Sequence, residues 1–442
     1  MERLAYKDLL KWKESERRKP LLVQGARQVG KTYLVRQFGE REYKNFIYLN
    51  FEQSANLRLV FSGDLNPEKL IENLGIYIGK KIESKNTLIF FDEIQVSEEA
   101  LTSLKYFYEE TPEFHIIAAG SLLGVSVAKN RSFPVGKVSF LSLYPMSFRE
   151  YLLAFGYELL FEQLHKILPN EPLPEFIHQK LQIVFKQYLF LGGMPEVLEN
   201  YRNNKDIAEV RKNQNEILSA YKRDFSKYTD TFQVVKTTQL WNSIPYQLAK
   251  ENKKFKYSDV QHKARASHYE FTIDWLKNAG LINIVNNISV PKLPLPAYAD
   301  ATKFKLYLPD SGILGAMLNV PSEIIVKPNA IFQEYNGAFI ENYVASELIN
   351  TGFKDLFYWT SPGAAEVDFV IQHNDRVYPI EVKSGLNKNL KSLRSYQQKY
   401  NPSFIIRTSP RNFILEKDFV NIPLYAISML PKFLQDLMQL HY

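Results

Sequence analysis

The chain has 442 residues, of which 45% are hydrophobic and 14% aromatic, so we expect about three folded domains and no long disordered segment. It contains no cysteine, which excludes disulfides and thiolate metal sites. The net charge of +7 is moderate, no stretch is apolar enough for a membrane span, and the N-terminal segment is too charged for a signal peptide, so we expect a cytoplasmic protein.

The first informative segment is residues 21–32, which read LLVQGARQVGKT. An apolar strand followed by the spacing G-x-x-x-x-G-K-T is typical of a P-loop, whose backbone N–H groups and following helix bind phosphates. We expect Lys31 to reach the β- and γ-phosphates of ATP and the Thr32 hydroxyl to ligate Mg²⁺. The predicted nucleotide contacts in this loop are Gly25, Gln28, Val29, Gly30, Lys31 and Thr32.

A second apolar run, residues 87–95 (TLIFFDEIQ), closes on two acids. Central strands of a parallel sheet are apolar on both faces, and ligands bind at their carboxyl ends, so these acids are expected beside the P-loop. In this position Asp92 would hold the Mg²⁺ shell, and Glu93 would orient and deprotonate the attacking water.

A third apolar strand, residues 114–119, ends in Gly120 and Ser121 at the same predicted edge. Ser121 is expected to sense the γ-phosphate, although a simple helix N-cap is the alternative. A P-loop strand, an acidic strand and a strand ending in a small polar residue together resemble the additional-strand P-loop ATPases of the AAA+ class.

The motifs GARQVGKT, FFDEIQ, AAGSLLG, SFPVGKVSFLSLYPMSFREYL and YLFLGGMPEVL follow one another in this order. They resemble the bacterial and archaeal AAA-type ATPases whose C-terminal half is a domain of unknown function. The resemblance implies an AAA+ fold and ATP binding, with a homo-oligomer as a candidate assembly. Many relatives carry Gly-Arg where this chain has Gly136-Lys137, so Arg131 and Arg149 remain as candidates for a cation that acts on a neighbouring subunit.

We expect an α/β chain with an AAA+ core over residues 1–150, a helical lid over 151–212 and a winged-helix domain over 213–324. The lid contains Gly-Gly-Met-Pro (192–195), a hinge or helix start. The winged-helix pattern consists of helices at 236–251, 258–263 and 267–279, followed by an alternating strand after Gly280. Its third helix is expected to begin at Ser267 and to turn Phe271, Trp275 and Leu276 toward the core. DNA binding and protein contact are both compatible with this pattern.

Residues 325–442 are predicted to form a second α/β domain around a hairpin, EVDFVI followed by VYPIEVK. With Asn374-Asp375 as the two loop residues, Asp368 lies opposite Glu381. The same register sets Glu366 opposite Lys383, all four side chains on one face.

Asp followed by Glu-x-Lys on the next strand resembles the PD-(D/E)XK nucleases, a restriction-endonuclease-like fold. The resemblance implies that Asp368, Glu381 and Lys383 are catalytic and that Asp368 and Glu381 share a metal with Glu341 of a preceding helix. The alternative is a cross-strand salt bridge between Glu366 and Lys383 on an exposed face.

Basic clusters within 250–265 and 383–411 suit phosphate backbones or are simply solvated faces. Two functions therefore stay open. One is an ATPase that binds or processes DNA through a nuclease-like domain. The other is a nucleotide-dependent regulatory or scaffold protein in which that domain is inactive and only contacts partners.

Overall fold

A computed structural model describes residues 1–121, 136–168, 170–228, 231–321, 332–363, 365–385 and 389–440. The chain divides into two compact units. Unit 1 comprises Met1–Tyr144 and Asn278–Leu281, and unit 2 comprises Pro145–Lys277 and Ile282–Tyr442. Among the helices described, none combines the length and apolar character needed to cross a membrane.

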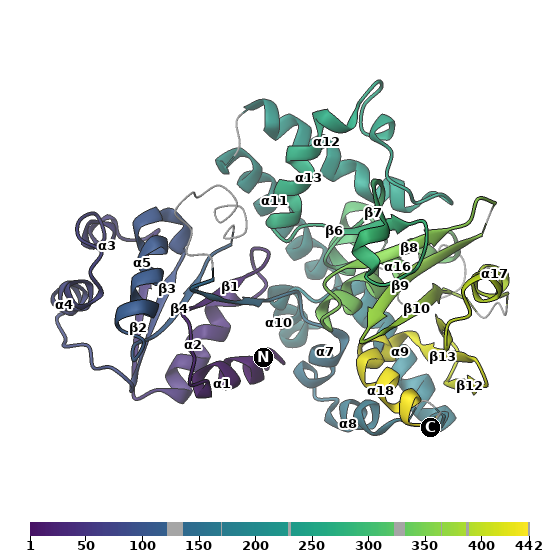
Figure 1. Ribbon diagram of the computed structural model, residues 1–442, viewed down its shortest axis with the longest axis horizontal. Coiled ribbons are helices and arrows are strands. Elements are labelled where there is room, and N and C mark those ends of the chain that lie inside the picture. The colour runs from purple at the N-terminus through teal and green to yellow at the C-terminus, as the bar shows by residue number, and fades with distance from the viewer. Residues whose placement is uncertain are drawn as a thin grey trace. The chain divides into compact units, whose positions relative to one another are not determined.

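Unit 1 is an α/β fold around one five-stranded sheet (Figure 1). Its strands are β1 (Leu21–Gln24), β2 (Asn45–Asn50), β3 (Thr87–Asp92), β4 (His115–Ala119) and β5 (Ser139–Ser142). Its helices are α1 (Tyr6–Glu14), α2 (Lys31–Glu42), α3 (Ala55–Val60), α4 (Pro67–Ile78) and α5 (Glu98–Glu110). The strands expected before the P-loop, within residues 87–95 and over residues 114–119 are observed as β1, β3 and β4, and the helix expected after the P-loop is α2.

The strand order is β2-β3-β4-β1-β5, and every pair is parallel. Strand β4 is inserted between the P-loop strand β1 and the acidic strand β3, which is the additional-strand arrangement expected from the sequence. All six residues of β3 are buried, because helices cover both faces of the sheet.

Alternation along β3 decides which side chains reach which face. Ile89 and Phe91 pack in one core cluster with α3, α4 and α5. Phe90 and Asp92 therefore point to the opposite face, against which α2 packs. The Asp92 carboxylate is thus placed on the side of the sheet where α2 begins.

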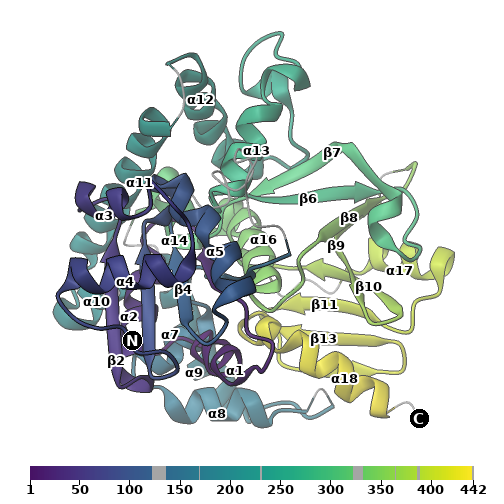
Figure 2. The same cartoon turned by 60° about the vertical axis from the view of Figure 1, so that its left-hand side comes forward.

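Unit 2 contains an eight-stranded mixed sheet of order β12-β13-β11-β10-β9-β8-β6-β7 (Figure 2). Its strands are β6 (Asn283–Ile288), β7 (Ala299–Tyr307), β8 (Leu356–Thr360), β9 (Glu366–His373), β10 (Arg376–Val382), β11 (Ile405–Ser409), β12 (Ile414–Glu416) and β13 (Phe419–Pro423). Helix α16 (Phe332–Asn350) packs against β7 and β10, and α17 (Lys391–Tyr400) packs against β9 and β10.

The other helices of unit 2 are α7 (Phe148–Ala154), α8 (Glu158–Lys166), α9 (Glu175–Leu191), α10 (Pro195–Asn204), α11 (Ile207–Tyr228), α12 (Thr231–Leu248), α13 (Glu270–Asn278), α14 (Ser311–Met317) and α18 (Leu430–Leu440). The segment expected as a separate lid is helical, but it is built into unit 2. The Phe185 ring lies 4.8 Å from that of Tyr343 on α16, and His178 is hydrogen-bonded to the Tyr425 hydroxyl at 2.7 Å.

The winged-helix pattern differs from the structure in two respects. The expected helix at 267–279 begins at Glu270, and Phe271 is exposed, whereas Trp275 and Leu276 are buried as expected. Strand β6 does not form a separate wing. It pairs with β7 and also with β8, so strands on both sides of the expected boundary at residues 324 and 325 share one sheet. Sequence periodicity defines a strand but not the partner along its edge.

The Gly-Gly-Met-Pro segment is a tight junction between α9 and α10. Gly192 has a positive φ of 74°, and the Gly193 N–H donates to Asp310 Oδ2 at 2.5 Å. A side-chain carbon on Gly193 would collide with the carbonyl oxygen of Met146. Glycine is therefore required here by close backbone approach and left-handed geometry.

Candidate functional site

The P-loop of unit 1 runs from the end of β1 to the start of α2 and has the backbone geometry of a phosphate-binding turn. Gln28 and Gly30 both have positive φ values, 66° and 94°. A side-chain carbon on Gly25 would collide with the carbonyl oxygen of Leu143. The two glycines of the motif are thus fixed by backbone shape, and Val29 between them is fully buried.

Lys31 and Thr32 open helix α2 and point in different directions. The Lys31 ammonium donates to the carbonyl oxygens of Gly25 and Ala26 at 2.9 and 2.8 Å, so its charge lies inside the loop. The Thr32 hydroxyl donates to Oδ2 of Asp92 at 3.0 Å. The structure therefore brings the two predicted Mg²⁺ ligands, Thr32 of α2 and Asp92 of β3, into contact next to the predicted phosphate contact Lys31.

Asp92 is buried at the end of β3 and has a second hydroxyl partner. The Tyr48 hydroxyl of the neighbouring strand β2 donates to Oδ2 of Asp92 at 3.0 Å, and the Asn50 amide donates to the Tyr48 oxygen at 3.1 Å. Burial raises the pKa of Asp92, and the hydrogen bonds from Tyr48 and Thr32 oppose that rise. Tyr48 and Asn50 are functional candidates that the sequence did not indicate, because their pairing with β3 is a tertiary relationship.

Glu93 follows Asp92 with a left-handed backbone, φ 52° and ψ 40°. Its Oε2 accepts hydrogen bonds from the Gln95 amide at 2.6 Å and from the Ser121 hydroxyl at 3.3 Å. The predicted base and the predicted γ-phosphate sensor are therefore in contact. Glycine or asparagine is usual at positive φ, so a glutamate here indicates a conformation retained at some energetic cost.

Arg3 is hydrogen-bonded to the backbone of the P-loop, a role that the sequence did not indicate. It is buried, and its two terminal nitrogens donate to the carbonyl oxygens of Val29 at 2.6 Å and Tyr144 at 2.7 Å. An arginine near the chain start in a charged segment gave no signal for this role.

Three basic residues were considered for a contact with a neighbouring subunit: Lys137, at the position where many relatives have arginine, and the candidates Arg131 and Arg149. Lys137 forms an ion pair with Glu109 at 2.9 Å. Arg149 is hydrogen-bonded to His165 at 2.7 Å, and burial lowers its pKa. Arg131 lies outside the described residues.

In unit 2 the hairpin register is confirmed through its paired residues. Arg376 pairs with His373 and Ile380 with Phe369, which leaves Asn374 and Asp375 as the loop. One step beyond the last pair are Asp368 and Glu381. The Val382 N–H donates to Oδ2 of Asp368 at 2.8 Å.

The partners of the charged hairpin residues differ from the salt-bridge alternative. Lys383 contacts Glu381 at 2.6 Å, two residues away on its own strand. Glu366 contacts Lys305 of strand β7 at 2.6 Å. The cross-strand ladder of Glu366 with Lys383 is therefore not the arrangement observed.

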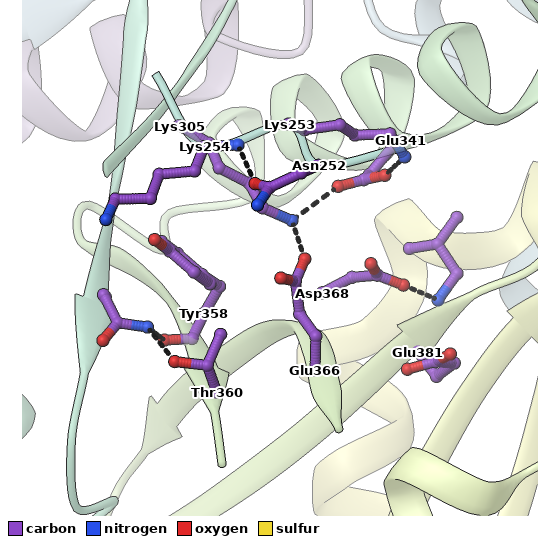
Figure 3. A network of polar contacts seen from close by, with 12 residues as sticks. Asn252, Lys253, Lys254, Lys305, Glu341, Tyr358, Thr360, Glu366, Asp368 and Glu381 are labelled. Atoms are coloured by element: carbon purple, nitrogen blue, oxygen red, sulfur yellow. Dashed lines mark hydrogen bonds and ion pairs between the residues drawn. The ribbon is translucent and has the colours of Figure 1, made fainter. Parts of the chain in front are cut away.

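Glu341 of α16 is buried and held by lysines, as Figure 3 shows. Lys253 contacts its Oε2, Lys305 lies 3.1 Å from Oε1, and the Tyr307 hydroxyl donates to Oε1 at 2.6 Å. Burial alone would raise the pKa of Glu341, but the two ammonium groups and the hydroxyl hold it at about 2.

The pKa values of the two hairpin acids shift upward, in the opposite direction to that of Glu341. Burial raises the pKa of both Asp368 and Glu381, and the negative charge of Glu341 adds to the rise in each case. Lys383 opposes this shift at Glu381.

A divalent cation does not fit this cluster well. Both oxygens of Glu341 are engaged by Lys253, Lys305 and Tyr307. Within the described ranges, no group of three or more acidic or histidine side chains is placed to hold a metal ion. The metal role of Glu341, Asp368 and Glu381 stays a sequence prediction that these contacts do not favour.

Lys305 is a residue of this cluster that the sequence analysis did not name. It lies between Phe304 and Leu306, and a lysine inside an apolar strand was the signal that could have identified it.

Three family models match the chain. Residues 17–152 match a model described as an AAA domain, so unit 1 carries an AAA-type ATPase domain. Residues 183–324 and 336–427 match two different domains of unknown function, DUF8612 and DUF4143. No curated protein matches the chain.

Several solved structures match the chain at low identity. The Walker-type ATPase of Pyrococcus abyssi is 15% identical with a TM-score of 0.44, over 72% of this chain and 95% of that one. The Aeropyrum pernix Orc1 protein in complex with DNA is 13% identical with a TM-score of 0.28, over 73% and 92%. The Thermotoga maritima RuvB branch migration motor is 13% identical with a TM-score of 0.30, over 64% and 89%. These low scores support no inference about the partners of this chain.

Proposed function

We propose that unit 1 binds ATP with Mg²⁺ and hydrolyses it, using the P-loop, Asp92, Glu93 and Ser121. The observation that carries the proposal is the contact between Thr32 and Asp92, because it joins the motif for phosphate binding to a buried carboxylate at the end of the acidic strand. Hydroxyl and carboxylate oxygens are the ligands that Mg²⁺ prefers, and an ammonium inside a glycine loop suits phosphate charge. The residues present therefore fit the expected nucleotide and metal.

Bound Mg²⁺ and ATP supply the phosphoanhydride bond that is broken and the cation that neutralises charge on the phosphates. Lys31 contributes a positive charge at the loop, and the Thr32 and Asp92 oxygens provide the metal-binding edge. Glu93 accepts a proton from the attacking water, because its carboxylate follows Asp92 at the same end of the sheet. The Ser121 hydroxyl donates a hydrogen bond to Glu93 Oε2, which helps to orient the base.

The test is a comparison of the full chain with Lys31→Ala and with Lys11→Ala, which removes an exposed lysine of α1. Wild type and Lys11→Ala should bind ATP and release phosphate in the presence of Mg²⁺. Lys31→Ala should lose binding, because the phosphate charge contact is gone. Equal ATP affinity in all three proteins, measured by calorimetric titration, would remove the P-loop assignment.

For unit 2 we propose that the hairpin of β9 and β10 does not cleave nucleic acid. The support is that Lys305 and Lys253 engage the carboxylate that a nuclease would use for metal. Wild-type protein incubated with single- and double-stranded DNA and RNA, with Mg²⁺ or Mn²⁺, should leave the strands intact. Metal-dependent cleavage that disappears in Lys383→Ala would favour the nuclease hypothesis instead.

A further inference from the structure

The acidic motif FFDEIQ of unit 1 ends in Gln95, a residue to which the ATPase proposal gives no role. Gln95 lies in η1 (Ile94–Val96), a single 3₁₀ turn between strand β3 and helix α5. The turn is held at both ends. The Val96 N–H donates to the Glu93 carbonyl oxygen at 3.2 Å, and the Ser97 hydroxyl caps the start of α5. Gln95 therefore has a defined place directly after the two acids.

The contact with Glu93 determines how the Gln95 amide is oriented. Nε2 of Gln95 donates to Oε2 of Glu93 at 2.6 Å. A carboxylate that acts as a base is ionised and can only accept hydrogen bonds, so the amide nitrogen must face Glu93. The left-handed backbone of Glu93 permits this contact, since side chains two residues apart do not face each other on a helix. The amide oxygen of Gln95 is thus left for another partner.

That amide oxygen has no donor from the protein. Oε1 of Gln95 is buried and lacks a hydrogen-bond partner among the residues that the structure describes. Buried polar side-chain atoms usually have a partner, because an unmet acceptor destabilises the folded chain. Over the same described residues, both side-chain hydrogen bonds of Glu93, from Gln95 and Ser121, fall on Oε2. Gln95 Oε1 and Glu93 Oε1 therefore belong to two side chains in direct contact, and each oxygen is open to a donor.

A water molecule fits this pair of acceptors. It has two O–H groups, so a single water can donate to Gln95 Oε1 and to Glu93 Oε1 at once. Its lone pairs then remain for attack on a phosphorus atom. Phosphoryl transfer depends on positioning of the nucleophile in line with the bond that breaks, so fixing both O–H groups favours the reaction.

We propose that Gln95 is a further catalytic residue of ATP hydrolysis, which holds the attacking water together with Glu93. This inference rests on the ATPase function proposed for unit 1. The water oxygen bonds to the γ-phosphorus, and the bond from that phosphorus to the bridging oxygen breaks, its electron pair leaving with ADP. One water proton passes to Glu93. The other stays on the transferred oxygen and is only hydrogen-bonded to Gln95, because a neutral amide is not a base.

The experiment compares the wild-type chain with Gln95→Met and with Gln179→Met, the same change at an exposed position of α9. Methionine has nearly the length of glutamine but lacks its amide. Phosphate release should fall roughly 10-fold to 100-fold in Gln95→Met, the effect expected for the loss of two hydrogen bonds. The dissociation constant for ATP should stay unchanged. Gln179→Met should match the wild type in both measurements.

A second measurement separates the positioning of water from a structural role. ADP with beryllium fluoride imitates bound ATP, whereas ADP with aluminium fluoride imitates the transition state and includes the attacking water. Gln95→Met should keep wild-type affinity for the first complex and lose at least roughly 10-fold in affinity for the second. Without nucleotide, Gln95→Met should melt no lower than the wild type, because the change removes a buried acceptor that has no donor.

The contrary outcomes are distinct from one another. Phosphate release by Gln95→Met at the wild-type rate would overturn the catalytic role, and a faster rate would mean that Gln95 restrains Glu93. Equal losses for both fluoride complexes, together with a lower melting temperature, would make Gln95 a structural residue. If Gln95→Met does not fold, Gln95→Asn is judged by the same criteria, since its shorter side chain withdraws both polar atoms. A wild type that binds ATP no better than Lys31→Ala would instead remove the ATPase proposal itself.

Discussion

The Tyr48 hydroxyl donates a hydrogen bond of 3.0 Å to Oδ2 of Asp92, the oxygen that also accepts the Thr32 hydroxyl. Three elements of unit 1, namely β2, β3 and the first turn of α2, thus meet at one carboxylate oxygen. The parallel register of β2 on β3, in which Tyr48 pairs with Phe90 and Asn50 with Asp92, makes this meeting possible. A residue outside the recognised motifs therefore orients the predicted metal-binding acid.

Tyr48→Phe should reduce ATP hydrolysis by roughly 2-fold to 10-fold, because one hydrogen bond contributes about 0.5–1.5 kcal/mol. The Asp92 carboxylate would keep Thr32 but lose a donor that fixes its orientation. Steady-state phosphate release measures the effect. Tyr77→Phe is the control, since its hydroxyl bonds to Ser54 on the exposed surface. A Tyr48→Phe rate equal to that of this control would show that the hydroxyl does not act through Asp92.

Glu93→Gln should keep ATP binding and reduce hydrolysis by about 10²-fold to 10⁴-fold, the range that a positioned base provides. The amide has nearly the same shape, but it cannot accept the proton of the attacking water. Fluorescent nucleotide titration measures binding, and phosphate release measures turnover. Glu83→Gln changes an exposed glutamate and should leave both values unchanged. If Glu93→Gln hydrolysed ATP at the wild-type rate, another residue would have to be the base.

Arg3→Met should weaken ATP binding, because the Val29 carbonyl within the P-loop loses its buried donor. An unsatisfied buried carbonyl costs about 1–3 kcal/mol, part of which should appear as a rise in the dissociation constant. Affinity is measured well below the melting temperature, with Arg17→Met as an exposed control. A lower melting temperature with unchanged affinity would restrict Arg3 to a structural role.

The stability of unit 2 should fall as pH rises because of Glu347. Burial raises the pKa of this carboxyl from 4.5 to about 7, although the Phe148 N–H donates to Oε1 at 2.9 Å and Arg149 lies nearby. The folded state therefore holds the proton more tightly than the unfolded state. The stabilisation is complete below about pH 4.5 and is lost as pH rises through about 7.

Glu347→Gln has no proton to lose, so the wild type should lose about 2–3 kcal/mol relative to this variant between pH 5 and pH 8. Urea unfolding of both proteins at the two pH values gives the difference. Glu216→Gln, an exposed change on α11, should follow the wild type at both values. A constant gap between wild type and Glu347→Gln would mean that Glu347 titrates normally.

Local patterns were sufficient for several parts of this protein. The spacing of Gly25, Gly30 and Lys31 predicted the P-loop turn, because a phosphate loop requires glycines at positions fixed by chain geometry. The two-residue turn at Asn374 and Asp375 predicted the hairpin register, because side chains alternate with a period of two along strands. Continuous apolar runs predicted the buried parallel strands of unit 1 for the same kind of local reason.

Other features were decided by packing between distant segments. The sequence placed β6 in a separate winged-helix domain, whereas its free edge pairs with β8 in the sheet of unit 2. It predicted Glu341 as a metal ligand but could not identify Lys305, which is 36 residues away, as its partner. Spacing along the chain determines turns, faces and registers, because these depend on neighbouring residues. Strand order and the neutralisation of buried charges depend on which surfaces are buried together, so only the tertiary structure decided them.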